Sequence, residues 1–281
     1  MIEAFDNPPM QRAFVGGLLA AVACGIIGVY TVVKKMAAIS GGVSHASFGG
    51  IGIGYYFEMN PITAALLFTV ASALGMGFAI RRTKLSQDVV IMAIWATGMS
   101  LGVLLLFLTP GYKPDIATYL FGNVLLVSNA DLQRMAIIDV IIVLVVVLLY
   151  KEFLALSFDE EFGTVVGAPM RGLYYLLLCL VALTVVVVIK VIGVILITAL
   201  LVLPVMTSKQ LTHTLWKMML LSIALGMLIT TAGLWLAYEL DLPPAPPIAF
   251  IGVALWLVSL AFSNMRNRRK TITASSESST G

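Results

Sequence analysis

The sequence predicts an all-α polytopic membrane protein with about eight or nine transmembrane helices and no soluble domain. Hydrophobic residues make up 60% of the 281 residues and charged residues only 11%, whereas soluble domains carry about a quarter charged residues. Several uncharged runs reach about twenty residues, the length that crosses a bilayer. Runs such as 140–149 are apolar on every face, which excludes an outer-membrane barrel and leaves helices to satisfy the backbone in lipid.

Nine segments have the length and apolar character of a membrane span. They are residues 14–33, 36–57, 61–80, 89–108, 135–150, 172–191, 193–208, 218–238 and 248–262. The segment 115–127 is moderately apolar but too short to cross, so we expect it on the outer face or partly re-entrant.

The basic residues predict the orientation of these spans. With the C-terminus placed inside, thirteen of the 17 lysines and arginines fall on the inner side, and only Arg12, Lys113, Arg134 and Lys190 fall outside. This distribution fits the positive-inside rule and places the N-terminus outside. We expect residues 1–265 to form a single transmembrane permease domain in the plasma (inner) membrane. Residues 266–281 are basic and then rich in Ser and Thr, which predicts a disordered cytoplasmic tail.

Several classes of function are excluded by the absence of their motifs. No glycine-rich loop ends in Lys followed by Ser or Thr, so we expect no ATP site, no bound cofactor and no enzyme in this chain. Active transport would draw its energy from a partner or an ion gradient. A formal charge of +3 without interleaved basic and aromatic residues argues against a nucleic-acid partner. Cys24 and Cys179 lie inside apolar runs and are expected to be packing residues.

The stretch SGGVSHASFGGIGIGYY, residues 40–56, holds one of the two histidines of the chain. If the span starts just after the lysine pair, His45 lies about 14 Å into a hydrocarbon core about 30 Å thick. At 100° per residue, Gly41, Phe48 and Gly52 share its helix face, so we expect these residues to line a path with it. His45 either offers a nitrogen transiently to a passing metal ion or hydrogen-bonds to a neighbouring helix and fixes packing.

Two further residue patterns leave alternatives open. An intramembrane enzyme could pair Ser44 or Ser47 with His45, although their spacing on one helix does not suit the usual dyad geometry. A gradient-driven carrier using His45 is another alternative. Asp139 lies about one turn into its predicted span, where it either faces a path or, as we favour, reaches the interface.

The inner loop LSFDEEFGTVVGAPMRG, residues 156–172, predicts a short helix that docks a partner. Ser157 can cap this helix, and residues 159–161 suit its positive end. Gly167, followed by Pro169, stops it. Its apolar side requires a partner to cover it. That side consists of Phe158, Phe162, Val165 and Val166.

With these pieces in place, the chain resembles the membrane subunit of ATP-binding-cassette importers for zinc, manganese or iron, the ZnuB/TroC-like metal permeases. The resemblance covers nearly the whole chain. It is carried, in order, by VVKKMAAISGGVSHASFGG, RRTKLSQDVVIMAIWATGMSLG, YLFGNVLLVSNADL, SFDEEFGTVVGAP, VIGVILITALLVLPVMTSKQL and DLPPAPPIAFIGV.

The resemblance implies a permease that passes a divalent metal ion into the cytoplasm. The implied partners are two cytoplasmic ATPase subunits, an extracytoplasmic metal-binding protein and a second copy of the permease. Glu161 and Gly167 match the glutamate-to-glycine spacing of the coupling loop, here residues 156–170. The residues expected to couple to the ATPase are Phe158, Asp159, Glu160, Glu161, Gly163 and Gly167. Many relatives have an aspartate four residues before the histidine that matches His45, and this chain has Gly41 there.

Overall fold

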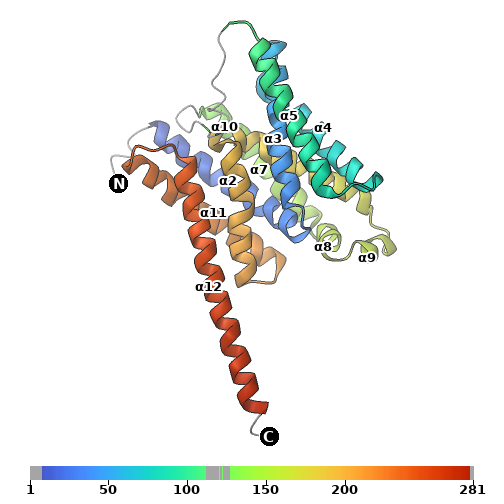
Figure 1. The fold of residues 1–281 in the computed structure, drawn as a ribbon, viewed down its shortest axis with the longest axis vertical. Coiled ribbons are helices and arrows are strands. Elements are labelled where there is room, and N and C mark those ends of the chain that lie inside the picture. Colours follow the sequence, from blue (N-terminus) through green and yellow to red (C-terminus); the bar gives the residue numbers. More distant parts are fainter. Residues whose placement is uncertain (1–7, 112–119, 121, 123–126, 279–281) are drawn as a thin grey trace.

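The computed structural model describes residues 8–111, 120, 122 and 127–278, and the regular elements in these ranges are helices (Figure 1). The predicted outer segment 115–127 lies almost entirely outside them. The helices are α2 (Pro8–Val33), α3 (Ala37–Tyr56), α4 (Pro61–Arg82), α5 (Gln87–Leu108), α7 (Asn129–Leu148), α8 (Tyr150–Phe158), α9 (Glu160–Val165), α10 (Met170–Leu211), α11 (Leu215–Glu239) and α12 (Ala245–Ser278).

The helices confirm a multi-pass membrane protein. Within the described ranges, seven helical segments are long and apolar enough to cross a bilayer, and the pair α7 and α8, bent by 75°, makes eight if it is one broken span. Helix α3 has 20 residues and is therefore about 30 Å long, enough to cross as well. Its glycines, serines and His45 keep it out of the seven segments just counted, and it packs against α4, α5 and α10.

Helix α7 begins earlier than the sequence predicts, at Asn129 instead of residue 135. A reciprocal capping box explains the start, because Ser128 Oγ accepts a hydrogen bond from the Asp131 amide at 3.2 Å, and Asp131 Oδ2 accepts one from the Ser128 amide at 3.1 Å. The polar residues Asp131 and Arg134 conceal these first turns in a hydropathy pattern. The helix thus has more than one polar turn before the apolar residues that begin at Met135.

Helix α10 contains the two predicted spans 172–191 and 193–208. The chain breaks helical geometry at Gly193, where φ is 77° and ψ is 164°, a conformation that glycine adopts without steric cost. The segments on either side, Met170–Ile189 and Val191–Leu211, are each long enough to cross. Two spans thus follow each other with a break of very few residues.

The glycines of α3 allow neighbouring helices to approach closely. A Cβ added at Gly52 would lie 2.6 Å from the carbonyl oxygen of Gly102 in α5, and one added at Gly98 would lie 2.7 Å from the Cα of Ala46. Such distances are too short for any side chain between the two backbones. The glycine-rich sequence of α3 is therefore first of all a packing surface for α4 and α5.

Helix α12 extends beyond the other helices toward the C-terminus (Figure 1). Its backbone is helical to Ser278 and so overlaps the tail, residues 266–281, for which the sequence predicts disorder. The chain has no proline or glycine between Gly252 and Gly281, so no helix-breaking residue interrupts it there.

Candidate functional site

His45 lies near the middle of α3. It follows Ala37 by eight residues, which places it about 12 Å along the helix. Its half-buried imidazole stacks on the indole of Trp95 in α5, with ring centroids 4.2 Å apart and planes inclined by 13°. Its Nδ1 is buried and has no hydrogen-bond partner among the described residues. The ring is thus oriented by stacking, and Nδ1 does not tie it to a neighbouring helix.

The residues predicted to share the face of His45 differ in their surroundings. Gly41 is half-buried, and a Cβ there would meet only the Thr198 methyl group in α10, at 3.7 Å. Phe48 is fully buried, and Gly52 lies against Gly102 of α5. Of these three residues, only Gly41 has room for an added methyl group, and the assignment of all three to a path stays a prediction.

Trp95 is the residue of this site that sequence reasoning missed. It follows Gln87, the first residue of α5, by eight residues, the same interval that separates His45 from Ala37. Both helices begin on the predicted inner side, so the equal intervals place the two rings at equal depth. This equal spacing from the two helix starts is the sequence signal that could have identified Trp95. The indole Nε1 donates a hydrogen bond to the Met99 sulfur at 3.2 Å, and the side chain is 38% exposed.

The serines beside His45 do not form a hydrolase dyad. Ser44 Oγ donates to the carbonyl oxygen of Ser40 at 2.8 Å, and Ser47 Oγ donates to that of Ser44 at 2.6 Å. Both hydroxyls are fully buried and are satisfied within their own helix. The intramembrane-enzyme alternative therefore lacks the serine–histidine hydrogen bond that it needs.

Asp139 is buried among the helices of the bundle, and its position at the membrane interface stays a prediction. Because α7 starts at Asn129, Asp139 lies ten residues into the helix and is only 6% exposed. Its Oδ2 is buried without a hydrogen-bond partner among the described residues.

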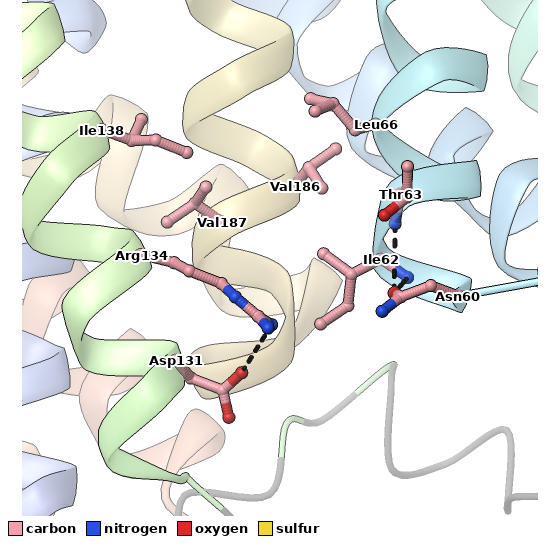
Figure 2. Close-up of a pocket in the computed structure, with 9 residues that line it drawn as sticks. All are labelled: Asn60, Ile62, Thr63, Leu66, Asp131, Arg134, Ile138, Val186 and Val187. Carbon is pink, nitrogen blue, oxygen red and sulfur yellow. Dashed lines mark hydrogen bonds and ion pairs between the residues drawn. The ribbon is translucent and has the colours of Figure 1, made fainter.

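An apolar-walled vestibule opens at the outer ends of α4, α7 and α10 (Figure 2). Two adjoining cavities of about 270 and 280 Å³ form it, and both include side chains of all three helices. The residues lining both cavities are Asn60, Ile62, Arg134 and Val186. Figure 2 shows Arg134 of α7 facing Ile62 of α4 across this space. Sequence reasoning missed the vestibule because its walls come from helices far apart in the chain.

The charged residues of the vestibule are paired. Arg134 Nη1 lies 3.7 Å from Asp131 Oδ1, and the Asp131 side chain is 7% exposed. The second cavity extends to Ile51 and Tyr55 in the outer half of α3. Ile51 follows His45 by six residues, so the vestibule begins about 9 Å along α3 from the imidazole.

The predicted docking helix exists as α9, but its cap differs from our expectation. Asp159, not Ser157, is the N-cap, because its Oδ1 accepts a hydrogen bond from the Phe162 amide at 2.8 Å. Ser157 Oγ instead donates to the carbonyl oxygen of Phe153 within α8, at 2.7 Å. Gly167 ends the turn with φ of 88°, and its amide donates to the carbonyl oxygen of Thr164.

The side chains of this loop point in two directions. Its apolar residues are strongly exposed: Phe158 63%, Phe162 61%, Val165 86% and Val166 68%. Asp159, Glu161 and Gly167 are exposed as well, whereas Gly163 is buried against Met170 and Glu160 is half-buried. An apolar surface of this kind outside the spans fits a protein partner.

Metal ligands are sparse in the described ranges. They contain no group of three or more His, Cys, Asp or Glu side chains placed to hold an ion. Stable zinc or manganese sites use more donors than one imidazole. His45 therefore fits a brief contact with a passing ion better than a storage site.

Comparisons with known proteins agree over most of the chain. The profile described as the ABC 3 transport family matches residues 6–263. An uncharacterized membrane protein of Synechocystis is 42% identical over 262 residues, covering 93% of each chain. A probable metal transport system membrane protein of Chlamydia pneumoniae is 33% identical over 255 residues, covering 89% of this chain and 87% of the relative.

Two further comparisons extend this result. The manganese transport system membrane protein MntC of Listeria monocytogenes is 30% identical over 254 residues, covering 90% of each chain. The structure of PsaBC from Streptococcus pneumoniae in complex with Fab superposes with a TM-score of 0.84 at 24% identity, over 92% of this chain and 93% of that chain, and so shares the fold. Sequence and fold together show that the chain belongs to the ABC 3 transport family.

Proposed function

We propose that this chain is the membrane-spanning permease subunit of an ATP-binding-cassette importer that moves a divalent metal ion into the cytoplasm. The observation that carries this proposal is the family match over residues 6–263. Relatives from Chlamydia and Listeria that are named for metal or manganese transport support the choice of cargo. Manganese is therefore the first metal to test, followed by zinc and iron.

The geometry supports a route from the outer vestibule past His45. The pair of Arg134 with Asp131 leaves the vestibule without a large uncompensated positive charge that would repel a cation. The vestibule reaches α3 at Ile51 and Tyr55. Farther along α3, the space beside Gly41 and the His45 imidazole gives the ion one nitrogen donor in passing. A weak contact of this kind allows the ion to leave again, as transport requires.

The energy is supplied by partner chains in this proposal. The exposed apolar side of α9 and its flanking residues forms the surface on which a cytoplasmic ATPase docks. An extracytoplasmic metal-binding protein delivers the ion to the outer vestibule. Two copies of the permease assemble with two ATPase subunits, which is the arrangement implied by the family resemblance. This chain contributes no catalytic residue.

The proposal is tested by uptake in cells that lack their own importer and carry this permease with its ATPase and binding protein. We expect His45→Ala to lower metal uptake without lowering the amount of protein in the membrane. His213→Ala is the matched control, because His213 is exposed in the loop between α10 and α11. Full uptake with alanine at position 45 would return His45 to a packing role. No ATP-dependent metal uptake in the wild type would contradict the proposed function itself.

A further inference from the structure

Glu160, the first residue of α9, forms ion pairs with two basic residues of the permease body. Its Oε2 lies 3.1 Å from Lys34 Nζ, and its Oε1 lies 2.5 Å from Arg81 Nη2. Lys34 directly follows the last residue of α2, and Arg81 lies in the last turn of α4. We call Lys34, Arg81 and Glu160 the Glu160 cluster. It joins α9 to two membrane-spanning helices that are far apart in the sequence.

Both basic residues are themselves held in place. Lys34 Nζ also donates to the carbonyl oxygen of Leu156 in α8, at 2.7 Å. The Arg81 guanidinium lies 4.0 Å from the ring centroid of Tyr174, near the start of α10. The Lys34 and Arg81 side chains are only 13% and 28% exposed, so solvent screens these ion pairs less than typical surface pairs. The cluster therefore connects α8 and α9 with α2, α4 and α10.

The ionisation of Glu160 agrees with this geometry. Partial burial alone would raise the pKa of the carboxyl group, but hydrogen bonds and charge interactions with Arg81 and Lys34 outweigh it and lower the pKa. A carboxyl with a lowered pKa stabilises the folded arrangement above its ordinary pKa of about 4.3. That contribution is lost as the pH falls through the lower folded-state value. At neutral pH the Glu160 carboxyl group is therefore ionised.

The cluster lies at a strained junction between α2 and α3. Lys35 has a left-handed φ of 59°, which residues other than glycine adopt only at a cost, and the Met36 amide donates to the carbonyl oxygen of Thr31 at 2.6 Å. Helix α3 starts two residues after Lys35, at Ala37. A force on Lys34 therefore acts next to the start of the helix that carries His45.

We propose that Glu160 is a positioning residue that anchors α9 to the junction of α2 and α3 and to the end of α4, so that movement of α9 driven by the ATPase reaches the helix carrying His45. This inference rests on the proposed function. It separates two roles within the predicted coupling loop. The exposed apolar residues Phe162 and Val165 face the partner, whereas Glu160 faces the permease body.

The test is the Glu160→Gln variant in the complete complex, reconstituted into proteoliposomes, with ATP hydrolysis and metal uptake measured together. Glutamine keeps the size of the side chain but removes the charge that pairs with Lys34 and Arg81. We expect ATP hydrolysis to continue and the number of metal ions moved per ATP to fall at least about fivefold. Glu152→Gln in α8 is the matched control, since Glu152 forms no ion pair within the described ranges.

A charge exchange distinguishes positioning from simple loss of fold. The double variant Glu160→Arg with Arg81→Glu keeps a pair of opposite charges between positions 160 and 81 but places the new arginine beside Lys34. We therefore expect it to recover part of the metal moved per ATP that Glu160→Arg alone loses. An unchanged ratio in Glu160→Gln would overturn the inference. Loss of ATPase co-purification from a folded Glu160→Gln permease would also overturn it, because Glu160 would then act at the partner interface.

Amide hydrogen exchange of the permease provides a readout that does not depend on transport. The amides of Gly163 and Val166 donate to the carbonyl oxygens of Asp159 and Phe162 within the α9 turn. We expect these amides to exchange at least about fivefold faster in Glu160→Gln than in the wild type. Exchange at the wild-type rate would overturn the anchoring role even if the complex transported no metal. Absence of metal transport in the wild type would contradict only the proposed function.

Discussion

Substitution of alanine for two glycines of α3, Gly52 and Gly41, should change the stability of the permease in opposite directions. The structure gives the approximate size of each effect. Gly52→Ala adds a methyl group 2.6 Å from the carbonyl oxygen and 2.7 Å from the Cα of Gly102. Ordinary van der Waals contact of a Cβ begins near 3.4 Å, so α3 and α5 must separate by roughly 0.8 Å. The opposing atoms are backbone atoms of Gly102, so no change of side-chain rotamer can relieve the contact.

The expected cost of Gly52→Ala is about 1–3 kcal/mol, the range measured for overpacked cores. Gly41→Ala is the matched control on the same helix, because its Cβ would meet only Thr198, at an ordinary 3.7 Å. Alanine is favoured over glycine in a helix interior by about 0.5–1 kcal/mol, so this variant should be neutral or slightly more stable.

The measurement is thermal unfolding of the purified permease in detergent, followed by tryptophan fluorescence or by a fluorescent dye that reacts with cysteine thiols as they become exposed. We expect a lower midpoint for Gly52→Ala and an unchanged or higher midpoint for Gly41→Ala. Equal shifts of the two variants would refute the assignment of Gly52 to close packing and of Gly41 to open space. A stabilised Gly52→Ala would show that α3 and α5 do not approach as closely as described.

The remaining predictions concern the site and the docking loop. Gly41→Asp should fit sterically and add a carboxylate one turn from His45, so metal should protect the purified variant against heat more than it protects the wild type; equal protection would contradict this. Asp159→Ala removes the cap of α9 and should destabilise that helix by about 1 kcal/mol, seen as faster amide exchange at Phe162, whereas Ser157→Ala should leave it unchanged. Because the Glu160 pKa is lowered, α9 protection should persist from pH 7 to about 5.

Much of the fold could be predicted from the sequence because lipid imposes a simple rule on each span separately. The lengths of the apolar segments were enough to locate nearly every helix. The predicted excess of basic residues on the inner side is consistent with Lys34, Arg81 and Glu160 meeting at one end of the bundle. The predicted membership in the family of metal permeases was confirmed by the match over residues 6–263. The stop at Gly167 followed from a local backbone requirement.

The predictions that the structure corrected depended on contacts between distant segments or on competition between neighbouring residues that could cap a helix. The start of α7 was concealed by Asp131, whose polarity serves the capping box with Ser128 and the pair with Arg134. The burial of Asp139 depends on the packing of α7 against α2 and α10. The choice of Asp159 over Ser157 as the cap of α9 depended on where α8 ends.

The packing around His45 could not be predicted for the same reason. Helical periodicity grouped Phe48 and Gly52 with His45, but the position of α5 decides which of these residues borders open space. The stacking of Trp95 on His45 also required the relative placement of α3 and α5. One sequence pattern allowed both a path and a packing surface, and the structure assigns most of the glycines to packing.

The measurement that tests the central claim most directly is metal accumulation by proteoliposomes that contain this permease, its ATPase and its binding protein. We predict that divalent metal, with manganese tested first, accumulates only when ATP is supplied to the side on which α9 lies. Accumulation should stop when the ATPase is omitted or inactivated. Accumulation without ATP, driven by an ion gradient alone, or no accumulation of manganese, zinc or iron under any condition, would contradict the account.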